Sequence, residues 1–252
     1  MSEAAFLEVE DVWRRFGGFV ALEGITARFS RSRVTAIIGP NGAGKSTFFN
    51  VLSGALVPSQ GRIRFKSADV TGLPQHRFLH LGIARSHQIT NIFPQLTVHE
   101  NVRVGAQALH ARYDLWTHRQ RRPLLADKAD AALAAVGLQD RRRRTAKLLS
   151  HGEQRALEVA IALVAEPELL LLDEPTAGMG PDETKQMVHL IERLAIDRSI
   201  LLVEHKMKMV LGLSDRILVL HHGKLIADGS PQQVQADAEV RRVYLGGCDV
   251  RA

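Results

Sequence analysis

Apolar residues follow two patterns along this chain. Near the N-terminus they alternate with polar residues at 7–12, 25–29 and 63–65, as in strands that bury one face. Later runs are apolar without alternation, which is typical of strands buried on both faces of a parallel sheet. These runs span residues 34–39, 168–173, 200–205 and 216–221.

Helical patterns separate the continuous runs. Residues 45–52 form one such pattern, and Pro181 opens another, whose apolar residues share one face. Strands that alternate with helices predict an α/β protein. From about residue 97 to 165 we find helix signals and no convincing strand, and an alanine-rich segment covers 126–136. We therefore predict an α/β core with an inserted helical lobe, in which residues 112–122 form a surface loop or a mobile helix end.

A glycine-rich stretch, GPNGAGKST, follows the first continuous run and opens a helix. It matches the pattern G-x-x-x-x-G-K-[ST] in the required order of strand, loop and helix. Its backbone N–H groups would face phosphates, Lys45 would contact the β- and γ-phosphates, and Ser46 would bind Mg²⁺. A glycine turn that only caps a helix is the alternative, but the order of elements favours a nucleotide site. The predicted nucleotide contacts are Gly39, Asn41, Gly42, Ala43, Gly44, Lys45, Ser46 and Thr47.

Two carboxylates, Asp173 and Glu174, end the next continuous run in the stretch ELLLLDEP. Ligands of parallel sheets bind at the carboxyl ends of strands, so we expect both beside the phosphate loop. Asp173 would hold Mg²⁺ directly or through water, and Glu174 would orient or deprotonate the attacking water. The pair alone also fits a charged strand end, and the phosphate loop favours the catalytic interpretation.

His205 ends a further apolar run at the same predicted edge. A lone histidine is more often a packed or surface residue, but here it would bond the γ-phosphate and couple it to Glu174. Gln88 follows the stretch GIARSH, which resembles another strand end, and by itself it carries little information.

The stretch LLSHGEQR begins another helix. Ser150 and Glu153 have the spacing of a capping box, in which each side chain bonds a free backbone N–H. Capping explains these two residues. It does not explain Gly152 between them.

Composition changes this picture little. The 252 residues are 45% hydrophobic and 24% charged, as in ordinary globular proteins. We expect no secretory signal and no membrane span, and the single cysteine, Cys248, fits a reducing cytosol. The net charge of +6 is concentrated partly in the run 141–144, where a solvated basic turn explains it. Few aromatic residues accompany the basic ones, so we expect no nucleic acid as a partner.

Taken together, GPNGAGKST, Gln88, LSHGEQ, LLLLDEP and His205 resemble, in that order, the ATP-binding subunits of ABC transporters. The order spans most of the chain. The resemblance implies one domain over residues 1–252 with a P-loop NTPase fold. It comprises a RecA-like core with an antiparallel β subdomain at about 1–90 and 155–252, and an inserted α-helical subdomain at about 91–154.

The resemblance also implies residue roles. Ser150 and Gly152 would face across a head-to-tail dimer and hold the γ-phosphate bound by the other subunit, as suits a helix N-terminus. Phe16 would stack on adenine, although a core aromatic at a strand end explains it about as well. Gln88 would contact Mg²⁺ and water, in a groove that receives a helix from a membrane permease. Residues 177–181 would form the turn that contacts the opposite site.

Four positions depart from the family pattern. His151 replaces the usual first glycine of the LSHGEQ segment, and its charge would oppose the helix dipole, so we expect the ring neutral or turned away. Gly180 replaces a common acidic residue, Lys206 stands where an aspartate commonly follows the histidine, and Ser86 with His87 precedes Gln88 instead of Thr-Phe.

A subgroup of the family, the branched-chain or hydrophobic amino-acid importers, matches further stretches. These are RFGGFVAL, TGLPQHR, LSHGEQRALEVA, EPTAGMGPDET, VEHKMKMV and RRVYLGG. The resemblance implies an ATPase subunit that uses ATP and Mg²⁺ on the cytoplasmic face of a membrane. It would bind permease subunits and a second ATPase subunit, like or unlike. A solute-binding protein would be an indirect partner.

Three other functions remain open at this stage. Importers of urea or other amides share much of the pattern. A soluble ABC ATPase acting on nucleic acid or ribosomes would use the positive charge. A P-loop kinase for small molecules would need an acceptor pocket and would not need the LSHGEQ segment.

Overall fold

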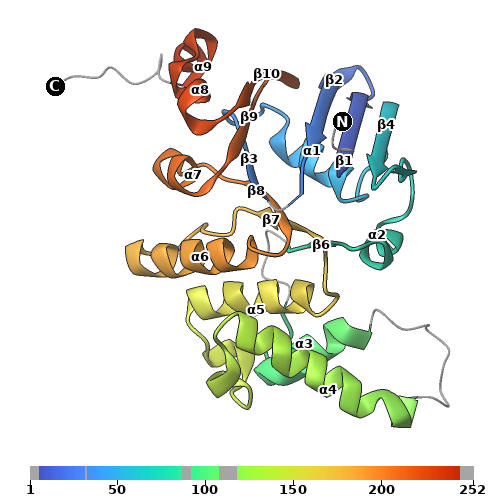
Figure 1. Cartoon of the computed structure of the whole chain (residues 1–252), viewed down its shortest axis with the longest axis vertical. Helices are drawn as coiled ribbons and strands as arrows, with labels where there is room; N and C mark the ends of the chain where they lie inside the picture. The colour runs from blue at the N-terminus through green and yellow to red at the C-terminus, as the bar shows by residue number, and fades with distance from the viewer. Residues whose placement is uncertain (1–5, 32, 87–91, 108–117, 245–252) are drawn as a thin grey trace.

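The computed structural model describes residues 6–31, 33–86, 92–107 and 118–244. Its strands form two sheets (Figure 1). The central six-stranded sheet has the order β10-β9-β3-β8-β7-β6, and a four-stranded antiparallel sheet has the order β2-β1-β4-β5. The central strands are β3 (Val34–Ile38), β6 (Ile83–Arg85), β7 (Leu169–Asp173), β8 (Ser199–Val203), β9 (Arg216–His221) and β10 (Lys224–Gly229). The others are β1 (Leu7–Phe16), β2 (Phe19–Phe29), β4 (Gln60–Phe65) and β5 (Ala68–Asp69).

The continuously apolar runs are the interior strands of the central sheet. All residues of β3, β7 and β8 are buried, and β9 is buried except at its two ends. Strand β3 runs parallel to β8 and β9, and β7 runs parallel to β6 and β8. The prediction of an α/β protein with a largely parallel sheet is therefore confirmed, and β10 adds one antiparallel edge strand.

Helix α1 (Lys45–Leu52) lies between the two sheets (Figure 1). Phe48, Phe49 and Leu52 are fully buried and join one apolar cluster with residues of both sheets. Burying three such side chains contributes on the order of 5 kcal/mol, so the start of α1 is held firmly relative to both sheets. The other face of the central sheet is covered by α5 (His151–Leu163), α6 (Pro181–Leu194) and α7 (Met207–Leu213).

The helical lobe lies at one end of the molecule (Figure 1). It contains α3 (Val98–Gln107) and α4 (His118–Ala135), which pack with α5, and two short 3₁₀ turns, η1 (Gln139–Arg141) and η2 (Ala146–Leu148). Within its described residues the lobe has no strand, only an isolated bridge between Thr97 and Thr145, as the helix signals predict.

Two predicted boundaries were wrong. Helix α4 begins at His118 and not near residue 126, so it includes part of the segment 112–122 that we predicted to be a loop or mobile end. Residues 108–117 lie outside the described part of the chain. Strand β8 ends at Val203, two positions before His205. The division at residues 91 and 154 remains a prediction, because one apolar cluster contains both Leu133 of α4 and Leu172 of β7.

Several short elements gave no clear signal in the apolar pattern. They are β5, β10, α2 (Gln75–Leu81), α7, α8 (Pro231–Ala236) and α9 (Ala238–Tyr244). The stability of a short helix or strand depends more on the elements that it pairs with or packs against than on its own sequence periodicity. None of the helices in the described part of the chain combines the length and apolar character that a bilayer span needs.

Candidate functional site

The predicted site residues gather where the parallel strands end. Asp173 ends β7 and pairs with Val203, and Val203 pairs on its other side with Ile37 of β3. The loop from Gly39 follows β3 directly, and His205 follows β8. Because these three strands are neighbours, their carboxyl ends bring the loop, the carboxylates and the histidine to one edge.

The phosphate loop is shaped by close approaches to neighbouring strands. Gly39 and Gly44 have φ of 157° and 99°, in the region that favours glycine. A Cβ on Gly39 would collide with the carbonyl oxygen of Leu220, and a Cβ on Gly44 would lie 2.7 Å from the carbonyl oxygen of Ala21. The loop can therefore pack against β9 and β2 only with glycine at these two positions.

The remaining loop residues differ in exposure. Asn41, Gly42 and Ser46 are exposed, Gly44 and Thr47 are partly buried, and Ala43 and Lys45 are buried. The α1 N-terminus has no side-chain cap and no acidic residue in its first turn among the described residues. Its partial positive charge is thus left for an anionic ligand.

Lys45 folds back over its own loop. Its Nζ donates to the carbonyl oxygens of Gly39 at 2.8 Å and Pro40 at 3.0 Å. Burial lowers the pKa of Lys45 below its ordinary value, and the nearby Glu174 carboxylate acts in the opposite direction. The ammonium therefore lies within electrostatic range of Glu174.

Arg85 holds Asp173, and we did not predict this residue. Its Nη2 donates to Asp173 Oδ2 at 2.8 Å, and its Nη1 donates to Asn50 Oδ1 at 2.6 Å and to Ser53 Oγ at 2.9 Å. Asp173 is only 3% exposed. One guanidinium thus joins the end of α1 to the carboxylate predicted to bind metal. Arg85 could have been proposed from the sequence, because it stands at the end of the stretch GIAR, which resembles a strand end.

Glu174 and His205 form a direct pair. Glu174 Oε1 lies 2.9 Å from His205 Nε2, and both side chains reach solvent. Glu174 has a positive φ of 47°, and its N–H donates to the carbonyl oxygen of Val203 at 3.0 Å. A non-glycine residue in this conformation costs about 1–3 kcal/mol and is often found at functional sites. The backbone here is fixed so that the carboxylate faces the histidine.

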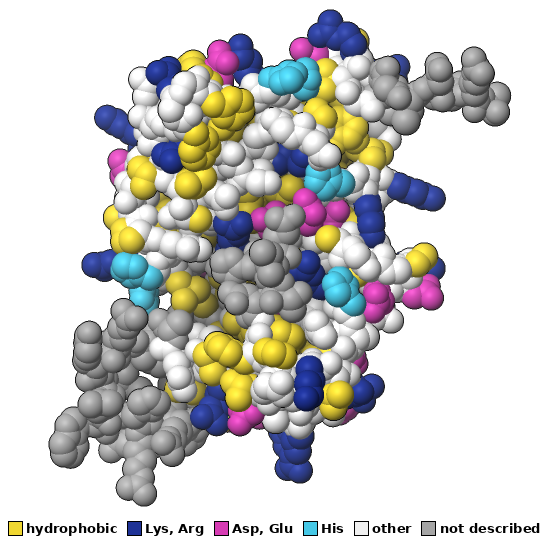
Figure 2. Space-filling view, turned by 180° about the vertical axis from the view of Figure 1, so that it is seen from behind, with side chains coloured by type: hydrophobic (Ala, Val, Ile, Leu, Met, Phe, Trp, Pro, Cys, Tyr) yellow, Lys and Arg dark blue, Asp and Glu magenta, His cyan; other side chains and the backbone are white. Residues whose placement is uncertain are grey.

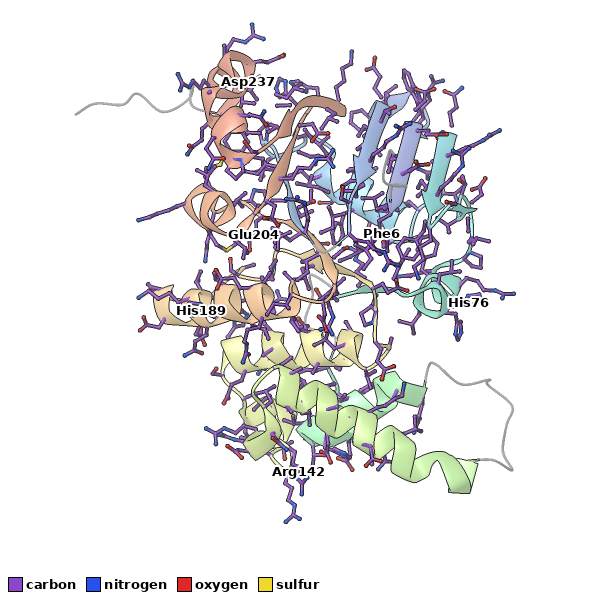
Figure 3. The ribbon with its side chains drawn as sticks, viewed as in Figure 1. Phe6, His76, Arg142, His189, Glu204 and Asp237 are labelled. Carbon is purple, nitrogen blue, oxygen red and sulfur yellow. The ribbon has the colours of Figure 1, made fainter. Side chains whose placement is uncertain are left out.

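Glu204, the buried neighbour of His205 in the sequence, was also missed. It lies in the middle of the molecule (Figure 3) and is 2% exposed. Its Oε1 accepts hydrogen bonds from Thr176 N–H at 3.0 Å and from Thr176 Oγ1 at 2.6 Å. Its Oε2 accepts from His205 N–H at 3.1 Å. Lys206 adds a hydrogen bond to the carbonyl oxygen of Thr176 at 3.1 Å, so the segments after β7 and β8 are tied together.

The start of α5 has the predicted capping box. Ser150 Oγ accepts from Glu153 N–H at 3.2 Å, and Glu153 Oε2 accepts from Ser150 N–H at 2.9 Å. A second carboxylate, that of Glu183 in the first turn of α6, also lies there. Its Oε1 accepts from Ser150 Oγ at 3.2 Å and from Gly152 N–H at 3.0 Å. Within the described residues, no hydrogen bond joins Ser150 or Gly152 to the phosphate loop of the same chain.

The electrostatics of this helix start follow from these contacts. The N–H of Gly152 lowers the pKa of Glu183, burial opposes this, and Gly180 N–H, Ser150 Oγ and His151 lower it further. The His151 ring faces Gly178, where an added Cβ would lie 3.2 Å from its Cε1. The ring is therefore turned toward the turn after β7.

Phe16 ends β1 with 44% of its surface exposed, so it is not a core aromatic. The guanidinium carbon of Arg14 lies 4.6 Å from its ring centroid. The ring is accessible to a flat ligand. Gln88 lies outside the described residues, so its predicted contacts with Mg²⁺ and water stay predictions.

A buried ion pair lies within α5, near the same edge of the sheet. Arg155 Nη1 lies 2.8 Å from Glu158 Oε2, and both side chains are almost fully buried. They line a small cavity together with Ser86, Val159, Asp173, Pro175 and Met187. The charged pair therefore shares this cavity with Asp173, the last residue of β7.

The loop, the neighbouring carboxylates and the sheet define a P-loop nucleotide-binding protein. Comparison with protein families extends this assignment. Residues 22–177 match the ABC transporter model, and residues 224–247 match the model of the branched-chain amino acid ATP-binding cassette transporter. The chain belongs to the ABC transporter family and is one of its ATP-hydrolysing subunits.

Individual relatives agree with this assignment. The high-affinity branched-chain amino acid transport ATP-binding protein LivG of Escherichia coli (strain K12) is 38% identical over 249 residues, which cover 95% of this chain and 97% of LivG. A crystal structure of a nucleotide-free ATP-binding cassette from an ABC transporter is 30% identical, with a TM-score of 0.86 over 95% of this chain and 98% of that chain. A cassette in its ADP conformation is 30% identical, with a TM-score of 0.87 over 97% of this chain and all of that chain.

Proposed function

We propose that this chain is the ATPase subunit of an importer for branched-chain or other amino acids, bound to permease subunits on the cytoplasmic face of a membrane. The single observation that carries the solute class is the match of residues 224–247 to the branched-chain cassette model. This segment includes β10, α8 and α9, and lies outside the part that matches the general ABC transporter model.

ATP would bind with its phosphates on the loop from Gly39 to Thr47. Inward-facing N–H groups and the α1 N-terminus supply donors, and Lys45 supplies the charge for the β- and γ-phosphates. The exposed ring of Phe16 is available for stacking on adenine. The remaining contacts to the γ-phosphate would come from Ser150 and Gly152 of another subunit.

The donor set also fits Mg²⁺. This ion is usually held by one or two carboxylates together with substrate phosphates and waters. Ser46 and Asp173 offer a hydroxyl and one carboxylate beside the loop, and Gln88 is the predicted third ligand. Among the described residues no group of three or more His, Cys, Asp or Glu could form a cage for metal, which suits a cation bound mainly through phosphates. Bound Mg²⁺ would neutralise phosphate charge.

Glu174 would accept the proton of the attacking water. His205, 2.9 Å from Glu174, would hold the carboxylate in place and bond the γ-phosphate. General-base action of this kind typically contributes about 10²- to 10⁴-fold to the rate. Lys45, close enough to act on Glu174, would stabilise negative charge on the transferred phosphoryl group.

Two ATPase subunits would complete each site by closing head-to-tail. Ser150 and Gly152 present a hydroxyl and an N–H at a helix N-terminus, and the phosphate loop of their own chain does not use them. A γ-phosphate on the second subunit would take these donors, so ATP would hold the dimer closed until hydrolysis. The helical subdomain at about 91–154 would pass the motion to the permease.

The experiment that tests this function has two parts. Glu174→Gln should still bind ATP, lose at least about 100-fold in hydrolysis, and accumulate a dimer with ATP and Mg²⁺. Lys45→Ala should lose nucleotide affinity in calorimetry. Full turnover by Glu174→Gln, or unchanged affinity in Lys45→Ala, would falsify the assigned roles.

The solute is tested by co-purification and reconstitution. We expect permease subunits and a second ATPase subunit to co-purify with this chain, and ATP-dependent leucine uptake to exceed urea or amide uptake in vesicles. Salt-sensitive RNA or DNA binding would favour a soluble ABC ATPase instead. On the face drawn in Figure 2, the described Lys and Arg side chains are scattered near the middle as well as around the outline and do not gather in one patch, which does not favour that alternative.

A further inference from the structure

Glu183 occupies the donors that the proposed function assigns to a second subunit's nucleotide. Its Oε1 accepts from Gly152 N–H at 3.0 Å and from Ser150 Oγ at 3.2 Å. A carboxylate oxygen and a phosphate oxygen are both anionic acceptors that a helix N-terminus attracts. The same donors cannot serve both ligands at full strength, so the two anions compete.

Gly152 and Ser150 each contribute to the contact with the Glu183 carboxylate. A Cβ on Gly152 would lie 3.0 Å from Glu183 Oε1, so a side chain at residue 152 would crowd the carboxylate at its present position on the N–H. Ser150 Oγ already accepts from Glu153 N–H, and a hydroxyl has a single proton to donate. That proton points to Glu183. The Ser150 hydroxyl, which would donate to a phosphate, therefore already donates to Glu183.

We propose that Glu183 is an affinity-determining residue of the dimer site, whose carboxylate covers the α5 N-terminus until a γ-phosphate from the second subunit displaces it. This inference rests on the proposed function, in which Ser150 and Gly152 contact that phosphate. Displacement breaks a link between α5 and the first turn of α6, which directly follows the turn at 177–180. The carboxylate also repels an approaching phosphate, which weakens dimer closure.

A structural role for the same contact predicts the opposite result. If Glu183 only fastens α5 to α6, its removal loosens the helix tip, and the dimer becomes weaker or stays unchanged. If Glu183 competes with the phosphate, its removal makes the dimer tighter. The sign of the change in dimer affinity therefore separates the two roles.

The test uses the full chain with Glu174→Gln, which holds the dimer closed. Glu183→Gln is added to remove the charge while keeping the shape of the side chain. Asp182→Asn is the matched control, because it removes the same charge from the same turn of α6, and Asp182 pairs with Lys185 of its own helix, at 3.4 Å. The dimer dissociation constant is measured by sedimentation velocity with saturating ATP and Mg²⁺. We expect Glu183→Gln to lower it about tenfold and Asp182→Asn to leave it within about twofold.

The outcomes separate a failure of the Glu183 proposal from a failure of the cross-dimer site. An unchanged or raised dissociation constant in Glu183→Gln, with the parent still dimerising on ATP, overturns the competitor role and leaves the cross-dimer site intact. If no variant dimerises on ATP, alone or with the second ATPase subunit, the cross-dimer site is wrong and both proposals fall. Glu183→Ala, which removes the acceptor entirely, should also tighten the dimer. Thermal melting checks that all variants are folded.

Discussion

The hydroxyl of Tyr244 accepts a hydrogen bond from the backbone N–H of Gly39 at 3.0 Å, across 205 positions of the chain. The same hydroxyl donates to the carbonyl oxygen of Gly39 at 3.2 Å. Burial raises the pKa of Tyr244, and the hydrogen bond with Gly39 only partly offsets this, so the hydroxyl keeps its proton at neutral pH. The last described helix, α9, is thereby attached to the first glycine of the phosphate loop.

Tyr244→Phe should weaken ATP binding. The ring remains, but Gly39 N–H loses its partner and the Gly39 carbonyl oxygen keeps only Lys45 Nζ, which costs about 1 kcal/mol and loosens the loop. We expect ATP affinity to fall up to about fivefold in calorimetry. Arg242→Gln, on the exposed side of α9, is the control. Equal affinity in Tyr244→Phe and the wild type would show that α9 does not support the loop.

Arg85→Met should destabilise the protein and impair hydrolysis more than ATP binding. The substitution leaves Asp173 buried without its guanidinium partner, and breaking a buried pair in this way costs about 3–5 kcal/mol. Urea unfolding measures the stability, and kcat compared with ATP affinity separates the two effects. The exposed Arg77→Met serves as control. A wild-type unfolding midpoint together with a wild-type kcat would contradict the assigned contact.

The Arg155–Glu158 pair should show strong coupling. Arg155→Met alone, or Glu158→Leu alone, breaks this buried pair and should cost about 3 kcal/mol or more in the free energy of unfolding. The double variant removes both charges and should recover a large part of that loss. A double-mutant cycle in urea measures the coupling, and additive losses from the two single variants would argue against a paired role.

The Glu183 contact predicts a defined pH dependence. Hydrogen bonds lower the pKa of Glu183 below its ordinary value of 4.5, chiefly the one from Gly152 N–H. A group with a lowered pKa stabilises the folded state above the unfolded pKa and loses that stabilisation as pH falls through the folded pKa. Glu183→Gln should therefore melt at a lower temperature than the wild type at neutral pH, and the difference should shrink below pH 4.5. A constant difference down to pH 3 would count against the contact.

Much of the fold could be predicted from the sequence because its signals are local. The interior strands are continuous apolar runs, and the box of Ser150 and Glu153 spans one helical turn. The predicted start of α4 was wrong because its first turns carry a polar, basic sequence that has no apolar stripe to reveal a helix. Short elements such as β10 were missed because partners distant in sequence stabilise them.

The sequence by itself determined the phosphate loop, the burial of the parallel strands and the chemical types present at their ends. These depend on residues within a few positions of one another, whose spacing fixes local geometry. Only the tertiary structure decided that Arg85 holds Asp173, that Tyr244 supports Gly39 and that Glu183 lies on Gly152. Such contacts depend on which strand ends and helix starts become neighbours, and packing of the whole chain fixes that arrangement.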